Sequence, residues 1–260
     1  MPDKSSESRF VFPRWANVVV PIALIALAGG IPYKVLMVGL IGAPSTTDVG
    51  YQPVQPIPYS HELHVNQLGM DCRYCHTTVE TSAFAAIPSA NICMNCHHAI
   101  RKLNSAGEAN PKLAALYKAY DSGMPIEWVK VHDLPDYSYF NHSAHINRGV
   151  SCVSCHDRVD QMGPEGVHQA KELSMGWCLK CHRNPTPNLR PQDQATNLMW
   201  GYTMTQQEID EVASLGVDVA GMEAGKALTD QQRQKVGHAV FDMENIREPI
   251  NMSDCSLCHR

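Results

Sequence analysis

All cysteines of this chain lie in one repeated pattern. Its 260 residues contain 10 cysteines, and each belongs to a Cys-x-x-Cys-His unit. The five units occupy residues 72–76, 93–97, 152–156, 178–182 and 255–259. No cysteine remains for a disulfide or a free nucleophile. Five copies in a chain of this length are not a chance occurrence, so the group that this pattern binds must dominate the fold.

This spacing is the attachment signature of a c-type haem. Two thiols bond to the haem vinyl groups, and the adjacent histidine is the proximal ligand of the iron. Zinc sites and thiol redox pairs also use Cys-x-x-Cys, but neither needs a histidine after every second cysteine. We therefore expect five c-type haems as cofactors. The predicted covalent attachment points are Cys72, Cys75, Cys93, Cys96, Cys152, Cys155, Cys178, Cys181, Cys255 and Cys258. The predicted proximal ligands are His76, His97, His156, His182 and His259.

A longer repeat supplies candidates for the opposite face of each iron. Residues 59–76 and 140–156 share the pattern aromatic-x-His-x-x-His-aliphatic-Asn before their Cys-x-x-Cys-His units. A duplicated pair of histidines in this position is hard to explain by core packing. The distal candidates are His61, His64, His132, His142 and His145, with Met175 and His98 in reserve. Met175 has an alternative interpretation, in which its thioether packs against a porphyrin face.

The number of candidate ligands decides the class of function, because it is enough to bind both faces of every iron. An iron with two protein ligands has no position left for a substrate, so it transfers single electrons and activates no oxygen, nitrite or peroxide. We therefore predict an electron carrier with no catalytic residues of its own. A multihaem reductase with an open iron is less consistent with the sequence, because such enzymes often replace the proximal histidine with lysine, and no Cys-x-x-Cys-Lys occurs.

The composition favours a mostly α-helical chain with extensive coil, wrapped around its haems. Only 5 Phe and 4 Trp are present, so we expect the haems to supply much of the apolar mass. A helix is predicted after Pro111, a second from a capping box at 205–208, and a third from near Thr229.

The N-terminal region contains a candidate membrane span. Residues 15–41 are apolar apart from Lys34, and 18 or more such residues are long enough to cross a bilayer. Arg9 and Arg14 precede the span and predict an inside N-terminus. A cleaved secretory signal is the alternative. Because thiols are linked to haem outside the cytoplasm, we expect a single-pass protein of the cytoplasmic (inner) membrane with its haem domain on the periplasmic side.

These features predict six segments. They are a cytoplasmic N-terminus (1–14), a transmembrane anchor (15–41), a linker (42–58), a first dihaem module (59–135), a second dihaem module (136–190) and a helical segment with the fifth haem (191–260). The net charge is −5, and haem propionates would make the surface more acidic, which argues against binding to nucleic acid.

At this level of detail the chain resembles a known family. The stretches PIPYSHELHVNQLGMDCRYCH, CMNCH, EWVKVHDLPDYSYFNHSAHINRGVSCVSCH and MGWCLKCHR are similar to the pentahaem cytochrome c subunit of alternative complex III. The resemblance runs from about Trp15 to Arg183. The His-x-x-His arrangement is more distantly similar to class III cytochromes of the c7 and c3 type.

The resemblance implies a subunit of a membrane quinol:acceptor oxidoreductase that relays electrons to a periplasmic cytochrome or another acceptor. It implies iron–sulfur, polytopic quinol-binding and monohaem cytochrome partner subunits. The alternative function is a membrane-anchored multihaem quinol dehydrogenase that feeds a periplasmic reductase. Which distal ligand serves which haem stays open at this point.

Overall fold

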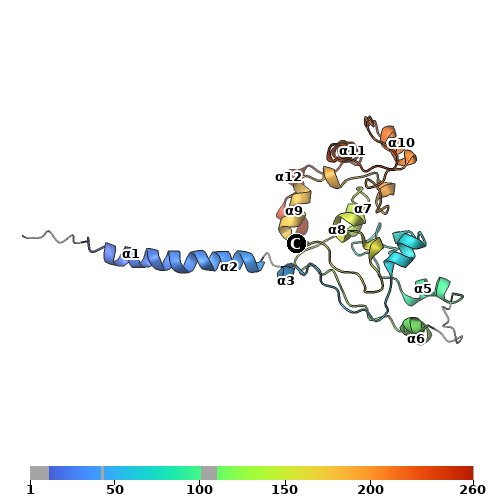
Figure 1. The fold of residues 1–260 in the computed structure, drawn as a ribbon, viewed down its shortest axis with the longest axis horizontal. Helices are drawn as coiled ribbons and strands as arrows, with labels where there is room; N and C mark the ends of the chain where they lie inside the picture. The colour runs from blue at the N-terminus through green and yellow to red at the C-terminus, as the bar shows by residue number, and fades with distance from the viewer. Residues whose placement is uncertain (1–11, 42–43, 101–109, 260) are drawn as a thin grey trace, which may run out of the picture. The chain divides into compact units, whose positions relative to one another are not determined.

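A computed structural model describes residues 12–41, 44–100 and 110–259 of the chain. The described residues form helices and coil, and their one β-bridge joins Val150 to Leu189. The predicted mostly α-helical class is therefore confirmed (Figure 1). The α-helices are α1 Ala16–Ile25, α2 Ile31–Ile41, α3 Pro44–Thr47, α4 Cys72–Cys75, α5 Ala90–His97, α6 Ala114–Ser122, α7 His142–Ile146, α8 Cys152–His156, α9 Met175–Arg183, α10 Gln206–Ser214, α11 Asp230–Met243, α12 Pro249–Met252 and α13 Cys255–Cys258.

Short π- and 3₁₀-helical turns connect or extend these helices. The π-helical turns are η1 Ala26–Gly30 and η2 Glu62–Gln67. The 3₁₀ turns are η3 Pro111–Leu113, η4 Val159–Gln161, η5 Thr186–Asn188 and η6 Gln192–Gln194. The chain divides into two compact units, residues 1–47 and residues 48–260.

The first unit is built on a continuous helical rod of α1, η1 and α2. Its stretch Ala16–Leu40 has 25 residues and a mean hydropathy of 1.9, so it is long and apolar enough to cross a membrane, as an anchor or as a signal segment. The segment predicted as a linker (42–58) includes the short helix α3 (Pro44–Thr47). From Tyr51 to Ser60 the backbone has no regular secondary structure.

The N-terminal half of the second unit has little core of its own. Two small clusters of buried residues hold it together, one built on Ile57, Met94 and Leu116 and the other on Val79, Ile146 and Ala195. Helix α6 follows Pro111 as predicted and packs against α5. Such sparse packing agrees with a chain that folds around bulky cofactors.

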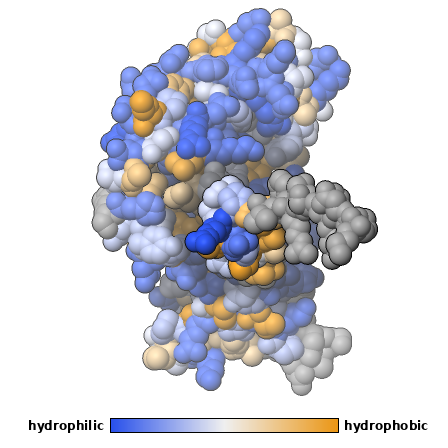
Figure 2. All heavy atoms as spheres, turned by 90° about the vertical axis from the view of Figure 1, so that its left-hand side faces the viewer, coloured by the Kyte–Doolittle hydropathy of each residue, from blue (hydrophilic) through white to orange (hydrophobic). Residues whose placement is uncertain are grey.

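The C-terminal segment differs from this half, because it contains a larger hydrophobic core made of its own side chains. Its buried residues are Leu189, Trp200, Met204, Ile209, Val212, Leu228, Val236 and Val240. Thr205 and Thr229 are the N-caps of α10 and α11, each with a complete capping box, so both predicted starts are confirmed. Figure 2 shows mainly hydrophilic residues over the upper part of the molecule, where α10 and α11 lie in Figure 1.

Helix α11 approaches the turn η5 unusually closely. A Cβ atom on Gly237 would lie 1.8 Å from the carbonyl oxygen of Thr186. Only glycine fits at that point, and the contact ties the C-terminal core to the chain that leaves α9.

Candidate functional site

Each Cys-x-x-Cys pair lies on a short helix. The helices α4, α5, α8, α9 and α13 carry the five units. Because residues three apart in a helix share one face, both thiols of a unit point to the same side. All ten cysteines are free.

Polar residues at the N-caps explain why such short helices form here. The carboxylates of Asp71 and Asp254 accept hydrogen bonds from the second residue of their helices. The hydroxyl of Ser151 accepts from the second residue of α8, and that of Ser174 accepts from Trp177, the third residue of α9. These caps satisfy backbone N–H groups that would otherwise have no partner.

The five units form an unbranched series. The thiols of Cys72 and Cys152 hydrogen-bond to each other, which raises the pKa of Cys72 and lowers that of Cys152. Cys75 lies near Cys93 and Cys96. The units at 93–97, 72–76 and 152–156 are therefore consecutive neighbours.

The series continues on the other side of α8. Burial raises the pKa of the Cys155 thiol to about 12, with contributions from the neighbouring thiols of Cys181 and Cys178. Cys178 in turn lies near Cys258. The complete order in space is 93–97, 72–76, 152–156, 178–182 and 255–259. Cys96 and Cys255, in the two terminal units, are the cysteines that are exposed.

The sequence repeat is also a structural repeat. Tyr59 lies edge-on to His61, with ring centroids 4.8 Å apart, and stacks on His64 at 4.5 Å. Phe140 lies edge-on to His142 at 4.8 Å and stacks on His145 at 4.5 Å. The corresponding interplanar angles are 87° and 21° in the first copy and 89° and 23° in the second. The same geometry therefore presents a histidine pair in both modules.

The second histidine of each pair faces the second attachment unit that follows it in the sequence. The ring centroids of His64 and His97 are 6.2 Å apart, and those of His145 and His182 are 6.1 Å apart. The structure thus brings each of these distal candidates next to one predicted proximal ligand.

The remaining candidates gather around His76 and His156. His142 lies parallel to His156, with centroids 6.5 Å apart and an interplanar angle of 6°. His132 lies edge-on to His156 at 4.5 Å, and its buried Nε2 has no hydrogen-bond partner. His61 lies near His76. The imidazoles of His61, His132 and His142 therefore lie close to those of His76 and His156.

Burial favours the neutral form of five imidazoles of the site. Desolvation lowers the pKa of His61 to about 4 and that of His156 to about 3, with the neighbouring imidazoles adding to the shift. Burial also lowers the pKa of His76, His132 and His145. A neutral imidazole is the form that binds a metal ion.

Seven histidines share one further feature, a hydrogen bond between Nδ1 and a backbone carbonyl. This bond leaves Nε2 free and fixes the ring, as expected for metal-binding histidines. The pairs, with N···O distances of 2.7–3.3 Å, are His64–Ser60, His76–Ala86, His97–Ile100, His142–Ala83, His145–Asn141, His182–Met252 and His259–Tyr137.

The two reserve candidates lie elsewhere. His98 is exposed, and Met175 is 67% exposed at the start of α9. His259 has the ring of Tyr137 as its neighbour, at 5.9 Å, and none of the five distal candidates gathers there among the described residues. His168, which the sequence does not single out, lies near His132.

These residues fit a c-type haem. Two imidazoles that bind one metal ion from opposite sides, with bonds of about 2 Å each, have ring centroids about 6 Å apart. Three pairs show this spacing. In the described part of the chain no three His, Cys, Asp or Glu side chains converge on one point. The donor set is one of paired imidazoles beside paired thiols, which is what haem attachment requires.

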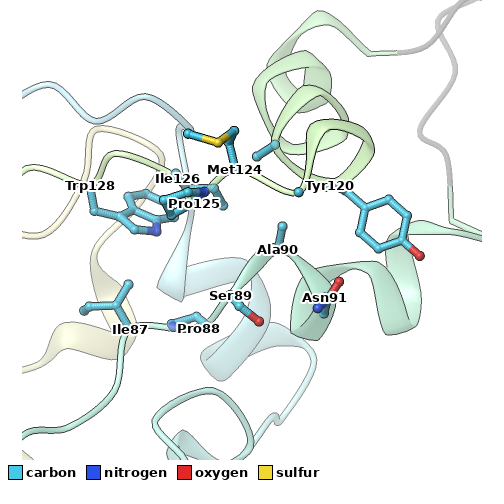
Figure 3. Close-up of a pocket in the computed structure, with 12 residues that line it drawn as sticks. Ile87, Pro88, Ser89, Ala90, Asn91, Tyr120, Met124, Pro125, Ile126 and Trp128 are labelled. Carbon is cyan, nitrogen blue, oxygen red and sulfur yellow. The ribbon is translucent and has the colours of Figure 1, made fainter.

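A separate pocket of about 410 Å³ lies between the start of α5 and the end of α6. Figure 3 shows Trp128, Ile126 and Met124 on one side and Ile87 to Asn91 on the other. The buried Nε1 of Trp128 has no hydrogen-bond partner. The pocket lies beside the helix that carries one terminal unit.

Two comparisons with known proteins agree with this site. Residues 138–208 match the family model described as cytochrome c7 and related cytochrome c. The multihaem cytochrome c subunit of menaquinone reductase from Nitratidesulfovibrio vulgaris is 32% identical over 151 residues, which cover 51% of this chain and 70% of that protein.

Proposed function

Because the chain belongs to the multihaem cytochrome c family that includes this menaquinone reductase subunit, we propose that it is the electron-transferring pentahaem subunit of a membrane-bound quinone oxidoreductase. The unbranched series of attachment units carries this proposal. Neighbouring units that end in two exposed ones relay electrons from one surface of the protein to another. The haems supply one-electron chemistry at iron.

The protein's own residues attach the haems and supply the ligands of their irons. The cysteine pairs anchor the haems, and the histidine of each unit is the proximal ligand. We assign His64 as the distal ligand opposite His97, and His145 opposite His182. Carbonyl groups that accept hydrogen bonds from Nδ1 hold the rings in place, so that Nε2 would be available to the iron of a haem.

We further propose the partners that the resemblance to alternative complex III implies. The span at 16–40 anchors the chain in the inner membrane, and residues 48–260 lie on the periplasmic side. Iron–sulfur, polytopic quinol-binding and monohaem cytochrome subunits complete the complex. Quinol is the electron donor, and a periplasmic cytochrome or another carrier is the acceptor.

In a second candidate function, electrons flow in the opposite direction, towards a quinone. The relative is named a menaquinone reductase, so a chain like this one can deliver electrons to a quinone. A third candidate, quinol oxidation by the subunit itself, has the pocket beside α5 in its favour. Its volume of about 410 Å³ and mainly apolar lining suit a ring ligand.

Mass and spectra test the proposal. The intact protein should carry five haem masses, and its haemochrome spectrum should give five haems per chain. In membranes, a quinol analogue should reduce these haems before any added cytochrome does. Reduction only from the cytochrome side favours the second candidate. A chain that carries no covalent haem refutes all three.

A further inference from the structure

Residues 194–197, the bridging segment, contact the start of α8. Ser151 Oγ donates a hydrogen bond to the carbonyl of Ala195 at 2.7 Å, and the backbone N–H of Cys152 donates to the same carbonyl at 3.4 Å. Ser151 is 1% exposed and is the N-cap of α8. The segment is therefore bonded to the first turn of the helix that carries Cys152 and Cys155.

The same segment contacts the start of α4. Thr196 Oγ1 donates to Asp71 Oδ2 at 3.1 Å, and Asp71 is the N-cap of α4. The other carboxylate oxygen of Asp71 accepts from the backbone of Arg73, so the cap and the bond to Thr196 exist together. Two adjacent residues, Ala195 and Thr196, therefore bond the N-caps of two helices that lie far apart in the sequence.

Buried side chains hold the bridging segment in this place. Ala195 is 1% exposed and packs in one cluster with Val79 and Ile146. Val79 follows the unit at 72–76, and Ile146 precedes the unit at 152–156. Close packing leaves such a cluster little freedom to change its dimensions, so the segment fixes the neighbourhood of both units.

The ends of the bridging segment are attached to the C-terminal core. Gln194 Nε2 donates to Glu211 Oε2 at 2.9 Å, and Asn197 Nδ2 donates to Glu208 Oε1 at 2.7 Å. Both glutamates belong to α10, which contributes Ile209 and Val212 to the core. The core therefore supports the segment from the side opposite to α4 and α8.

We propose that the bridging segment sets the separation of the haems attached at 72–76 and 152–156, with Thr196 as the positioning residue, an inference that rests on the proposed function. The thiols of Cys72 and Cys152 hydrogen-bond to each other, so the attachment points of these haems are adjacent. Since these thiols bond the vinyl groups, the two vinyl edges lie next to each other.

This contact is the one step that joins the two halves of an unbranched series. An electron that crosses it leaves one iron, which is oxidised from Fe(II) to Fe(III), and reduces the other from Fe(III) to Fe(II). No proton or further reactant is needed. The rate depends on how closely the two groups are held, so a loosened bridging segment slows exchange between the halves.

Soret circular dichroism and pulse reduction of the haem-loaded protein measure this contact. Neighbouring haems couple and split the Soret band, and deletion of a unit removes its contacts with both neighbours. One deletion variant combines Cys72→Ala with Cys75→Ala, and the other combines Cys152→Ala with Cys155→Ala. The coupling component and the exchange phase that are missing from both variants belong to the contact between these two units.

Thr196→Val removes the hydrogen bond to Asp71 and keeps the size of the side chain. It should weaken this coupling component and slow this exchange phase while five haems stay bound. The other components and phases should keep their wild-type values. Thr196→Ser keeps the hydroxyl and should recover the wild-type coupling and exchange.

Thr203→Val is the matched control. Thr203 is exposed in the bend before α10, so this variant makes the same change in the same part of the chain, outside the bridging segment. It should leave coupling and exchange unchanged. An equal loss in both valine variants overturns the proposal, because it would report a general loosening of the core.

The haem content separates the possible failures. If the wild type carries no covalent haem, the proposed function itself is wrong. If Thr196→Val holds five haems with wild-type coupling and exchange, only the role of the bridging segment is wrong. The same conclusion follows if all coupling components fall equally. If Thr196→Val does not accumulate, Thr196→Ala takes its place, because a smaller side chain introduces no clash.

Discussion

The histidines of the candidate site differ from ordinary buried histidines in where their hydrogen bonds go. In seven of them Nδ1 hydrogen-bonds a backbone carbonyl, which leaves Nε2 available for a metal ion. His64 and His145 have the same environment, because both bond the carbonyl four residues earlier and both stack on an aromatic ring. Replacing either one should expose an iron without disturbing its neighbours.

We therefore predict that His64→Ala and His145→Ala each open one haem. Reduced-minus-oxidised spectra with carbon monoxide should show binding by about one fifth of the haem above the wild-type level, since the chain has five units. His98→Ala, at an exposed position next to a proximal ligand, is the control and should bind no additional carbon monoxide. Full haem content with no added binding would contradict the distal assignment.

The sequence was sufficient to predict that these histidines form a set, but not how they pair. The His-x-x-His repeat singles out His61, His64, His142 and His145. Their partners depend on contacts between distant segments, such as the bond from His182 Nδ1 to the carbonyl of Met252, 70 residues away. A sequence motif does not show which backbone carbonyl will accept a hydrogen bond from a histidine. The roles of these residues as ligands therefore stay predictions.

Glu211 provides a test of electrostatics away from the haem units. Burial, followed by a hydrogen bond with Asp193, raises the pKa of Glu211 to about 7. A pKa that is higher in the folded than in the unfolded chain stabilises the fold below the unfolded value of 4.5. This contribution is lost as the pH rises through about 7.

We predict that the melting temperature falls between about pH 5 and pH 8, and that Glu211→Gln makes this fall smaller. Thermal unfolding followed by tryptophan fluorescence measures it, because Trp200 lies in the adjacent core. Glu223→Gln removes an exposed carboxylate that pairs with Lys226 and should keep the wild-type pH dependence. The same slope in Glu211→Gln and wild type would show that the pair with Asp193 has no effect.

At the scale of elements, local signals in the sequence predict the C-terminal helices well. Thr205 with Glu208, and Thr229 with Gln232, form the reciprocal hydrogen bonds of a capping box at the expected positions. The core that these helices build was not predicted, because its residues come from loops as well as helices. Trp200 and Met204, both almost fully buried, lie outside the helices, in the segment before α10.

The contact between α11 and η5 gives the next prediction. Gly237→Ala places a methyl group 1.8 Å from the Thr186 carbonyl oxygen, so the helix must move. Overpacking of this kind costs about 1–3 kcal/mol, and the denaturant midpoint should fall accordingly. Gly176→Ala in α9 is the control, since its Cβ meets only the Ser174 hydroxyl at 3.9 Å. Equal midpoints for the two variants would show that α11 is not held against η5.

At the scale of the whole molecule, the order of the units matters more than their number. The unit at 152–156 is in the middle of the series, between the thiol of Cys72 on one side and those of Cys178 and Cys181 on the other. The sequence order would place the unit at 93–97 between 72–76 and 152–156. The fold reverses these two, and only the three-dimensional structure shows it.

We predict that Cys152→Ala with Cys155→Ala divides the relay. The variant should retain four haems, yet electrons introduced by a brief pulse of reductant should no longer redistribute between the two ends. Cys255→Ala with Cys258→Ala removes a terminal unit instead, and redistribution among the other four should persist. Unchanged redistribution after loss of the central unit would mean that the series is branched.

Two sets of one aromatic ring and two histidines share one geometry: Tyr59 with His61 and His64, and Phe140 with His142 and His145. Tyr59 and Phe140 hold their histidines at matching distances and angles, and the two rings differ by a single hydroxyl oxygen. The chain thus contains two copies of one local geometry in different surroundings. Any chemical difference between the two histidine pairs therefore comes from that oxygen or from the residues around each copy. Each copy is a reference for the other within one molecule.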